Sequence, residues 1–142
     1  MKACLLDSDT LSELSRGHAR VTHNALMYLA EHGRLAFSSV TVFERLRGYR
    51  AALAAGKPYE SYLQAFEALY RSSRVLPVDA AVADRAADYW ARLPSRARRS
   101  LGDILIAATA SVNGLTLVTR NRKDFDPIAK LDSDLNLLDW TR

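Results

Sequence analysis

An α/β domain built on a mainly parallel sheet is the fold class that the sequence predicts, and three observations predict it. Five short apolar runs have the length of buried strands, at residues 3–6, 35–37, 75–78, 115–118 and 135–138. Longer segments with helical periodicity separate these runs, and such alternation is typical of parallel sheets. Glycines stand where helical segments end, at Gly33, Gly56 and Gly114, the usual position of a C-terminal cap.

The predicted helices cover residues 21–32, 40–55, 59–72, 80–93 and 101–113, and a shorter helix is expected after Thr10. A helix joined to a parallel strand by a short loop runs antiparallel to that strand. The helices at 40–55 and 101–113 should therefore begin at the edge of the sheet where the strands end. Open α/β sheets bind their ligands at this edge.

Length and composition indicate one globular domain, residues 1–142, with 49% apolar and 25% charged residues. No apolar stretch approaches the roughly 20 residues that span a bilayer, and "ACLL" at the start is too short for an export signal, so a cytoplasmic protein is expected. The single cysteine, Cys4, lies in a predicted strand and excludes a disulfide framework. A net charge of +4, with clustered arginines, suits a polyanion such as nucleic acid.

Side chains with oxygen atoms occupy the predicted ligand edge. Asp7 follows the first strand, Glu44 lies in the first turn of the helix after the second strand, and Asp103 lies in the first turn of the helix before the fourth. Asn121 and Asp124 follow the fourth strand, next to the hydroxyl of Thr119. Mg²⁺ prefers oxygen ligands, commonly one or two carboxylates with water and substrate phosphate. The sequence therefore predicts a divalent-cation site at this edge.

Each of these residues also has a local structural interpretation. "TVFE" at 41–44 and "SLGD" at 100–103 both match the pattern of a capping box, and Asp9 is placed to cap the first helix. Asn121 and Asp124 are typical of a turn that leads into a short helix. Capping accounts for each residue alone, but carboxylates that meet at one edge repel one another unless a cation or a base compensates.

Four motifs in order resemble the PIN-domain ribonucleases, and among them the VapC-type toxins of bacterial toxin–antitoxin pairs. The motifs are "LLDSDTLSEL", "SSVTVFERLRG" and "LGDILIAATASVNGLTLVTRN", which holds the third and fourth, followed by "RKDF". The resemblance implies a PIN-like α/β/α sandwich with about five strands, a site for Mg²⁺ or Mn²⁺, and endonucleolytic cleavage of RNA. It also implies a cognate antitoxin that covers the acidic site, and a homodimer.

The family's acidic positions fall on Asp7, Glu44 and Asp103, with the more variable fourth position at Asn121. Asp7 and Asp103 are the implied metal ligands, and Glu44 and Asp124 are expected to act through water. Two residues depart from the family pattern: Asp9 replaces a common Asn, and Asn121 replaces an acid that Asp124 or Asp126 would supply. The residues expected to contact the RNA phosphates are Thr119, Arg120 and Arg122.

Two other functions fit parts of the sequence. "DSDT" also resembles the first motif of haloacid dehalogenase-like phosphatases, with Asp7 as the nucleophile and Asp9 as the general acid. That family's last motif requires an acid where this chain has Ala107, and it leaves Glu44 without a task. The second alternative is a PIN-like module that binds RNA without cutting it. Apolar residues between Tyr59 and Tyr70 are candidate contacts for a protein partner.

Overall fold

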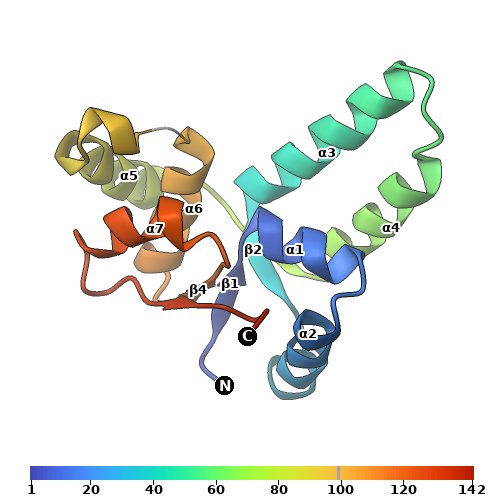
Figure 1. The fold of residues 1–142 in the computed structure, drawn as a ribbon, viewed down its shortest axis with the longest axis horizontal. Coiled ribbons are helices and arrows are strands. Elements are labelled where there is room, and N and C mark those ends of the chain that lie inside the picture. Colours follow the sequence, from blue (N-terminus) through green and yellow to red (C-terminus); the bar gives the residue numbers. More distant parts are fainter. Residues whose placement is uncertain (99) are drawn as a thin grey trace.

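Five short parallel strands form the centre of the fold (Figure 1). The computed structural model describes residues 1–98 and 100–142. The strands are β1 (Cys4–Leu6), β2 (Ala36–Ser38), β3 (Arg74–Leu76), β4 (Thr116–Val118) and β5 (Leu137–Leu138). β4 pairs with β1 and β5, and β2 pairs with β3, all in parallel. β1 and β2 lie side by side but belong to separate ladders, so the predicted sheet is confirmed but divided into two pieces.

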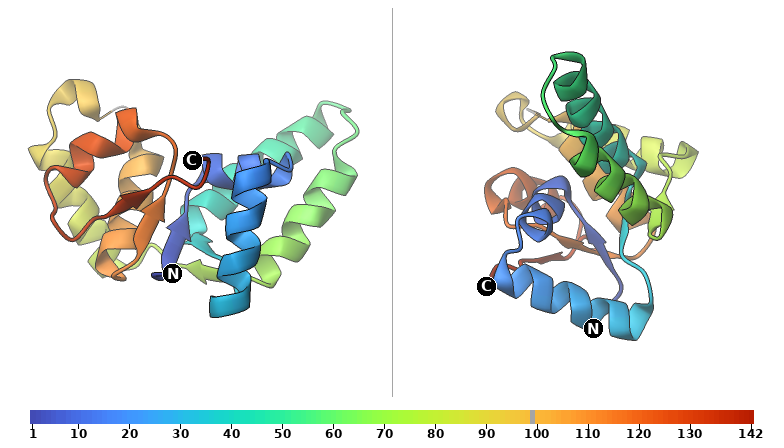
Figure 2. Two further views of the ribbon diagram at one scale, coloured as in Figure 1. Left: turned by 60° about the horizontal axis from the view of Figure 1, so that its bottom comes forward. Right: turned by 90° about the vertical axis from the view of Figure 1, so that its right-hand side faces the viewer.

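Helices connect these strands in the predicted order. They are α1 (Ser8–Ser15), α2 (Ala19–His32), α3 (Ser39–Ala54), α4 (Glu60–Arg71), α5 (Ala80–Arg92), α6 (Leu101–Val112) and α7 (Arg122–Ala129). Gly33, Gly56 and Gly114 all have positive φ at helix ends, as expected. α3 and α4 form a hairpin that extends away from the other helices (Figure 2). None of the helices in the described residues is long and apolar enough to cross a membrane.

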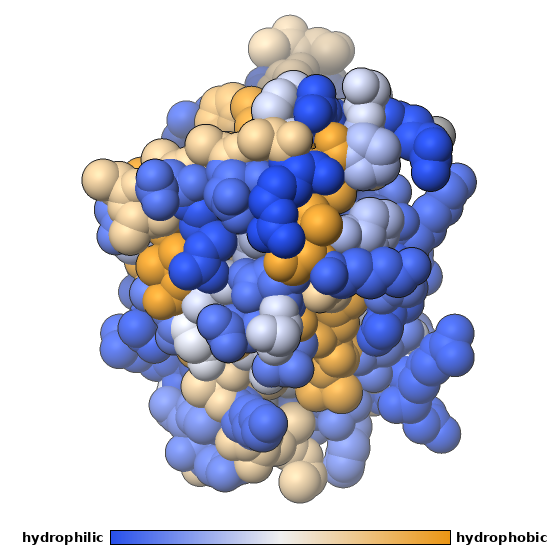
Figure 3. All heavy atoms as spheres, turned by 90° about the vertical axis from the view of Figure 1, so that its left-hand side faces the viewer, coloured by the Kyte–Doolittle hydropathy of each residue, from blue (hydrophilic) through white to orange (hydrophobic). Residues whose placement is uncertain are grey.

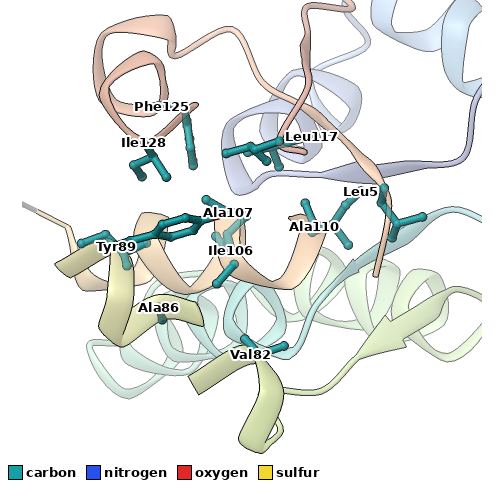
Figure 4. Packing of buried hydrophobic residues seen from close by; sticks show 14 of the residues in the cluster. Leu5, Val82, Ala86, Tyr89, Ile106, Ala107, Ala110, Leu117, Phe125 and Ile128 are labelled. Carbon is teal, nitrogen blue, oxygen red and sulfur yellow. The ribbon is translucent and has the colours of Figure 1, made fainter. Parts of the chain in front are cut away.

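Two apolar cores cover the two faces of the sheet, because successive side chains of a strand point to opposite sides. Leu5 packs with α5, α6 and α7, whereas Cys4 and Leu6 pack with α1 and α2. In the first core, Phe125, Ile128 and Tyr89 point toward α6 from α7 and α5 (Figure 4). The predicted α/β/α sandwich is therefore confirmed, with α6 as its most buried helix.

The first turns of α1 and α3 differ from the sequence prediction. Asp7, not Asp9, caps α1, because its Oδ1 accepts a hydrogen bond from the backbone N–H of Thr10 at 2.8 Å. Ser38, the last residue of β2, caps α3, so Thr41 lies inside the helix and the "TVFE" capping box is wrong. In both cases the helix begins directly after the strand, and the residue at the junction serves as the cap.

The interpretation of "SLGD" as the start of a helix capped by Ser100 is confirmed. The hydroxyl of Ser100 accepts a hydrogen bond from the backbone N–H of Asp103 at 3.1 Å, which fixes the start of α6. This bond uses the backbone of Asp103 rather than its carboxylate. Capping and a chemical role for Asp103 are therefore compatible.

A polar cluster that the sequence does not reveal joins α5, α6 and the chain before β5. The carboxylate of Asp132 accepts hydrogen bonds from the Tyr89 hydroxyl, from Ser111 Oγ at 2.5 Å and from Arg85 at 3.2 Å. Burial by itself raises the pKa of Asp132, but the hydrogen bonds from Ser111 and Tyr89 outweigh it and the pKa falls to about 2. The cluster is a structural connection between three segments.

Candidate active site

The candidate site lies at the carboxyl ends of β1 and β4, where the order of the strands in the sheet reverses. From β1 the chain continues to β2 and β3 on one side, and it later returns to β4 and β5 on the other side. Such a switch point leaves a crevice in which open α/β sheets bind ligands. The backbone N–H of Asp7 donates to the carbonyl of Val118 at 3.1 Å, which holds the two strand ends together.

Asp7 is a buried carboxylate with fixed neighbours. Its side chain is hydrogen-bonded to the Thr10 N–H and to the side chain of Thr119, and only 3% of the residue is exposed. Thr10 is itself held by a bond from its hydroxyl to the Val118 carbonyl at 3.1 Å. Burial raises the pKa of Asp7 above its ordinary value, although the bonds to Thr119 and Thr10 oppose this. The site therefore contains an acid that is costly to ionise in the absence of a cation.

Glu44 reaches the same region from α3. Its Oε1 accepts a hydrogen bond from Ser8 Oγ at 2.8 Å, so the first residue of α1 orients this carboxylate. Its Oε2 lies against Gly102 in the first turn of α6, where an added Cβ would be only 2.8 Å from the oxygen. Gly102 therefore permits the close approach of α6 to the Glu44 carboxylate.

Asp103 follows Gly102, and the charges of the other acids of the site affect its pKa. The pKa of Asp103 is raised to about 6, first by burial and then by the negative charges of Asp124, Asp7 and Glu44, in that order. Four carboxylates from four segments therefore share one electrostatic field, as the sequence predicts. We call Asp7, Glu44, Asp103 and Asp124 the acidic rim.

Asn121 supports the acidic rim instead of adding a charge to it. Its side-chain N–H donates to Asp124 Oδ2 at 2.8 Å, and its backbone N–H donates to the Thr119 hydroxyl at 2.9 Å. Asp124 lies with Asp103 along a pocket of about 180 Å³. Asp126 instead forms an ion pair with Arg122, with 2.9 Å between Asp126 Oδ1 and Arg122 Nε. Of the two acids considered as replacements for the fourth position, Asp124 is the one beside Asp103.

The cations near the rim have different partners. Arg120 pairs with the buried Glu13 at 3.4 Å, and Glu13 also binds Arg16 at 2.9 Å. Arg122 is occupied by Asp126. Lys123, which the sequence analysis does not single out, lines the pocket beside Asp103 and Asp124. The basic run "RNRK" after β4 was the available signal, but it does not indicate which of its side chains turns toward the acids.

The donor atoms of the acidic rim fit a hard divalent cation. All are carboxylate oxygens, the ligand type that Mg²⁺ and Mn²⁺ prefer. Mutual repulsion of Asp7, Glu44, Asp103 and Asp124 is relieved by a positive charge between them. In the part of the chain that the structure describes, no three His, Cys, Asp or Glu side chains are already gathered closely enough to hold a metal ion. The rim is thus a set of separate acids in one field.

Gly102→Ala is expected to reduce activity at this site without unfolding the protein. The new methyl group would displace the carboxylate of Glu44, whose Oε2 would be 2.8 Å away. Misplacing a group of an active site by about 1 Å costs roughly 10- to 100-fold in rate, and we expect a loss of activity of that size. Urea unfolding should change by no more than about 1 kcal/mol.

The matched control for this variant is Gly48→Ala in α3, four residues after Glu44. An added Cβ at Gly48 has no neighbour within 4 Å. The activity of this control should stay near that of wild type. Equal rates for the two alanine variants would show that the contact between Gly102 and Glu44 does not matter.

Comparisons with known proteins agree with this fold. The family model described as PIN domain matches residues 4–131. Ribonuclease VapC10 of Mycobacterium tuberculosis is 37% identical over 118 residues, which are 82% of this chain and 81% of that protein. The structure of VapBC-1 from nontypeable Haemophilus influenzae is similar with a TM-score of 0.80 and 24% identity, over 99% of both chains. VapBC-5 from Mycobacterium tuberculosis, from the VapBC family of toxin-antitoxin systems, has a TM-score of 0.52 and 28% identity over 75% of this chain and 81% of that one. This chain therefore belongs to the PIN-domain family and, within it, to the VapC ribonucleases.

Proposed function

We propose that this VapC-type PIN ribonuclease hydrolyses RNA phosphodiesters at the acidic rim, as an endonuclease that depends on Mg²⁺ or Mn²⁺. Asp7 and Asp103 are the proposed metal ligands, and Glu44 and Asp124 act through water. One observation carries the proposal: the pKa of Asp103 is raised to about 6 by burial and by the charges of the other three rim acids. Such a group of carboxylates, brought together from four segments, is suited to a cation.

Each rim residue has a distinct task in this proposal. When bound, the cation supplies positive charge that promotes ionisation of a water molecule and stabilises the phosphoryl oxygens. Thr10 and Thr119 hold Asp7 in position, and Ser8 orients Glu44 toward the rim. Asn121 orients Asp124 through its 2.8 Å hydrogen bond to the Asp124 carboxylate.

Cations next to the rim are the proposed contacts for the RNA backbone. Lys123 lines the pocket of Asp103 and Asp124, and Arg120 is held beside α1 by Glu13. We assign phosphate binding to both. Thr119, which the sequence analysis expects to contact phosphate, is fully buried with its hydroxyl bound to Asp7 and to the Asn121 N–H, so it positions Asp7 instead. Arg122 becomes available only if it leaves Asp126, so its contribution is expected to be smaller.

The two alternative functions have weaker support. In the phosphatase interpretation Asp9 is the general acid, but Asp9 is exposed in α1 and Asp7 caps that helix. Ala107, in the position where that family needs an acid, is fully buried in the core. Membership of the PIN-domain family also opposes a phosphatase. A module that only binds RNA would not require Asp7, Glu44 and Asp103 together at one site.

The test is RNA cleavage with and without divalent cations. Protein stripped with EDTA should leave a single-stranded RNA intact, and Mg²⁺ or Mn²⁺ should restore cutting at internal positions. Asp7→Asn should be inactive, whereas Asp9→Asn, which changes an exposed acid on the same helical turn, should cleave at nearly the wild-type rate. Full activity in EDTA would refute metal dependence, and binding without cleavage in Mg²⁺ would favour the non-catalytic alternative.

We also propose a protein antitoxin and a homodimer for this chain, in keeping with its VapC membership. The apolar residues of α4 offer less surface for such partners than the sequence indicates. Phe66 is buried against α3, and its ring packs against Tyr49 and Tyr70. Tyr62 is the large apolar residue of this helix that remains mostly exposed, at 59%. An antitoxin segment with a basic side chain would complement the acidic rim.

A further inference from the structure

A groove beside the acidic rim has a composition unlike that of the rim. It has a volume of about 570 Å³ and lies between the first half of α3 and the start of α6. Phe43 and Leu101, each 60% exposed, face it together with Val40 and Leu105, and Glu44 forms part of its lining. The groove thus joins an apolar surface directly to Glu44, an acid of the site. By contrast, the molecular face that includes α5 and α7 is mostly hydrophilic, with its apolar side chains in separate groups (Figure 3).

A cation covers the aromatic side chain of the groove. The guanidinium carbon of Arg47 lies 5.3 Å from the centre of the Phe43 ring, and both residues line the groove. Arg47 lies one helical turn after Phe43, so the helix itself holds the two side chains together. Aromatic rings and arginine planes are the groups on which proteins stack unpaired nucleobases.

We propose that this groove binds a base of the RNA strand next to the bond that is cut, and that Phe43 and Arg47 determine which nucleotide is preferred there. This inference rests on the proposed ribonuclease function. Stacking of a base on Phe43 and Arg47 would place its neighbouring phosphate at Glu44, which lines the same groove. Glu44 belongs both to the groove lining and to the acidic rim, so a base in the groove lies next to the rim.

Charge favours RNA over an apolar protein segment as the occupant. Arg47 is exposed, and Arg50 follows it on the exposed surface of α3. These positive charges attract a polyanion. The neutral base can lie against Phe43 while the strand's phosphates remain near the cations. Ser39 and Ser100 also line the groove and offer hydroxyls to the edge of a base.

The experiment compares the cleavage sites of wild type, Phe43→Ala and Phe43→Tyr in a pool of single-stranded RNA with random sequence. Sequencing the 5′ ends of the products gives the nucleotide preference around the cut. Phe43→Ala should flatten the preference at one adjacent position and raise KM by about tenfold, the size expected for one stacked base. Phe43→Tyr should retain the wild-type nucleotide preference and KM, because it keeps the aromatic ring. Leu26→Ala, which removes a side chain that is 63% exposed on α2, should change neither.

The possible results separate this inference from the proposed function. If wild type cuts none of the pool in Mg²⁺, the ribonuclease proposal itself fails. If wild type cuts and Phe43→Ala keeps the same nucleotide preference and KM, the base site is overturned. Should Phe43→Ala instead convert a dimer to a monomer with unchanged preference, the groove binds a second copy of the chain. Because Phe43 is 60% exposed, the alanine variant should fold, and circular dichroism will check this.

Discussion

Asp103→Asn is expected to abolish RNA cleavage and, without divalent cations, to make the protein more stable than wild type. Asn removes the charge that we assign to metal binding, so cleavage should fall by roughly 1000-fold or more. The same change removes repulsion from Asp124, Asp7 and Glu44. Because Asp103 is partly exposed, solvent reduces this gain, and we expect about 1 kcal/mol in the free energy of unfolding.

The stability gain of Asp103→Asn should depend on pH in a defined direction. Folding raises the pKa of Asp103 from 3.8 to about 6, so the folded state favours the protonated acid. In wild type, stability from this group is present below the unfolded pKa and is lost as pH rises through the folded value. The difference between Asn variant and wild type should therefore be larger at pH 7 than at pH 4.

Urea unfolding in EDTA at both pH values measures this difference, and Asp88→Asn is the control. Asp88 is an exposed acid of α5 that pairs with Arg92, away from the rim. Added Mg²⁺ should raise the melting temperature of wild type but not of Asp103→Asn, because a ligand stabilises only the state that binds it. An Asn variant that still cleaves RNA in purified Mg²⁺ would contradict the assignment.

Asp132→Ala is expected to produce the largest loss of stability outside the core, about 3 kcal/mol. The change leaves the charge of Arg85 and the hydroxyls of Tyr89 and Ser111 without their shared acceptor. The Asp132 side chain is only 11% exposed, so water replaces these bonds poorly. Because the pKa of Asp132 is lowered to about 2, its contribution is present above the ordinary pKa of 3.8 and is lost as pH falls through about 2.

Denaturant unfolding at pH 7 tests this connection, with Asp134→Ala as the neighbouring exposed control. Tyr89→Phe removes the hydrogen bond from the Tyr89 hydroxyl to Asp132 and should cost about 1 kcal/mol. Cleavage measured at low temperature, where the variants remain folded, should stay close to wild type because the cluster does not touch the rim. A loss below about 1 kcal/mol for Asp132→Ala would mean that water satisfies the three donors.

Local patterns account for the parts of the fold that the sequence predicts well. The strands and helices follow from periodicity, and the glycines after α2 and α6 mark helix ends through their backbone freedom. The meeting of Asp7, Glu44 and Asp103 follows from the direction of helices beside parallel strands. The division of the sheet between β1 and β2 was not predicted, because short apolar runs do not specify which neighbours form a ladder.

Contacts between distant residues account for what the sequence did not predict. The resemblance assigns Asn121 to the family's fourth position, but only the folded turn reveals that it binds Asp124. Gly102 reads as part of a short motif, and its closeness to Glu44 depends on the packing of α3 against α6. The Asp132 cluster joins residues 21, 43 and 47 positions apart, a spacing that carries no periodic signal.

The gap between the two ladders has a mechanical consequence for the site. Glu44 follows β2, whereas Asp7 and Asp124 follow β1 and β4, which belong to the other ladder. The acids therefore follow strands of two separate ladders. The hydrogen bond between Ser8 and Glu44 connects the helix after β1 to the helix after β2. Because no ladder bond joins β2 to β1, side-chain contacts set the position of Glu44 relative to the other acids: this hydrogen bond, and the packing of Phe37 with Leu6 in the core.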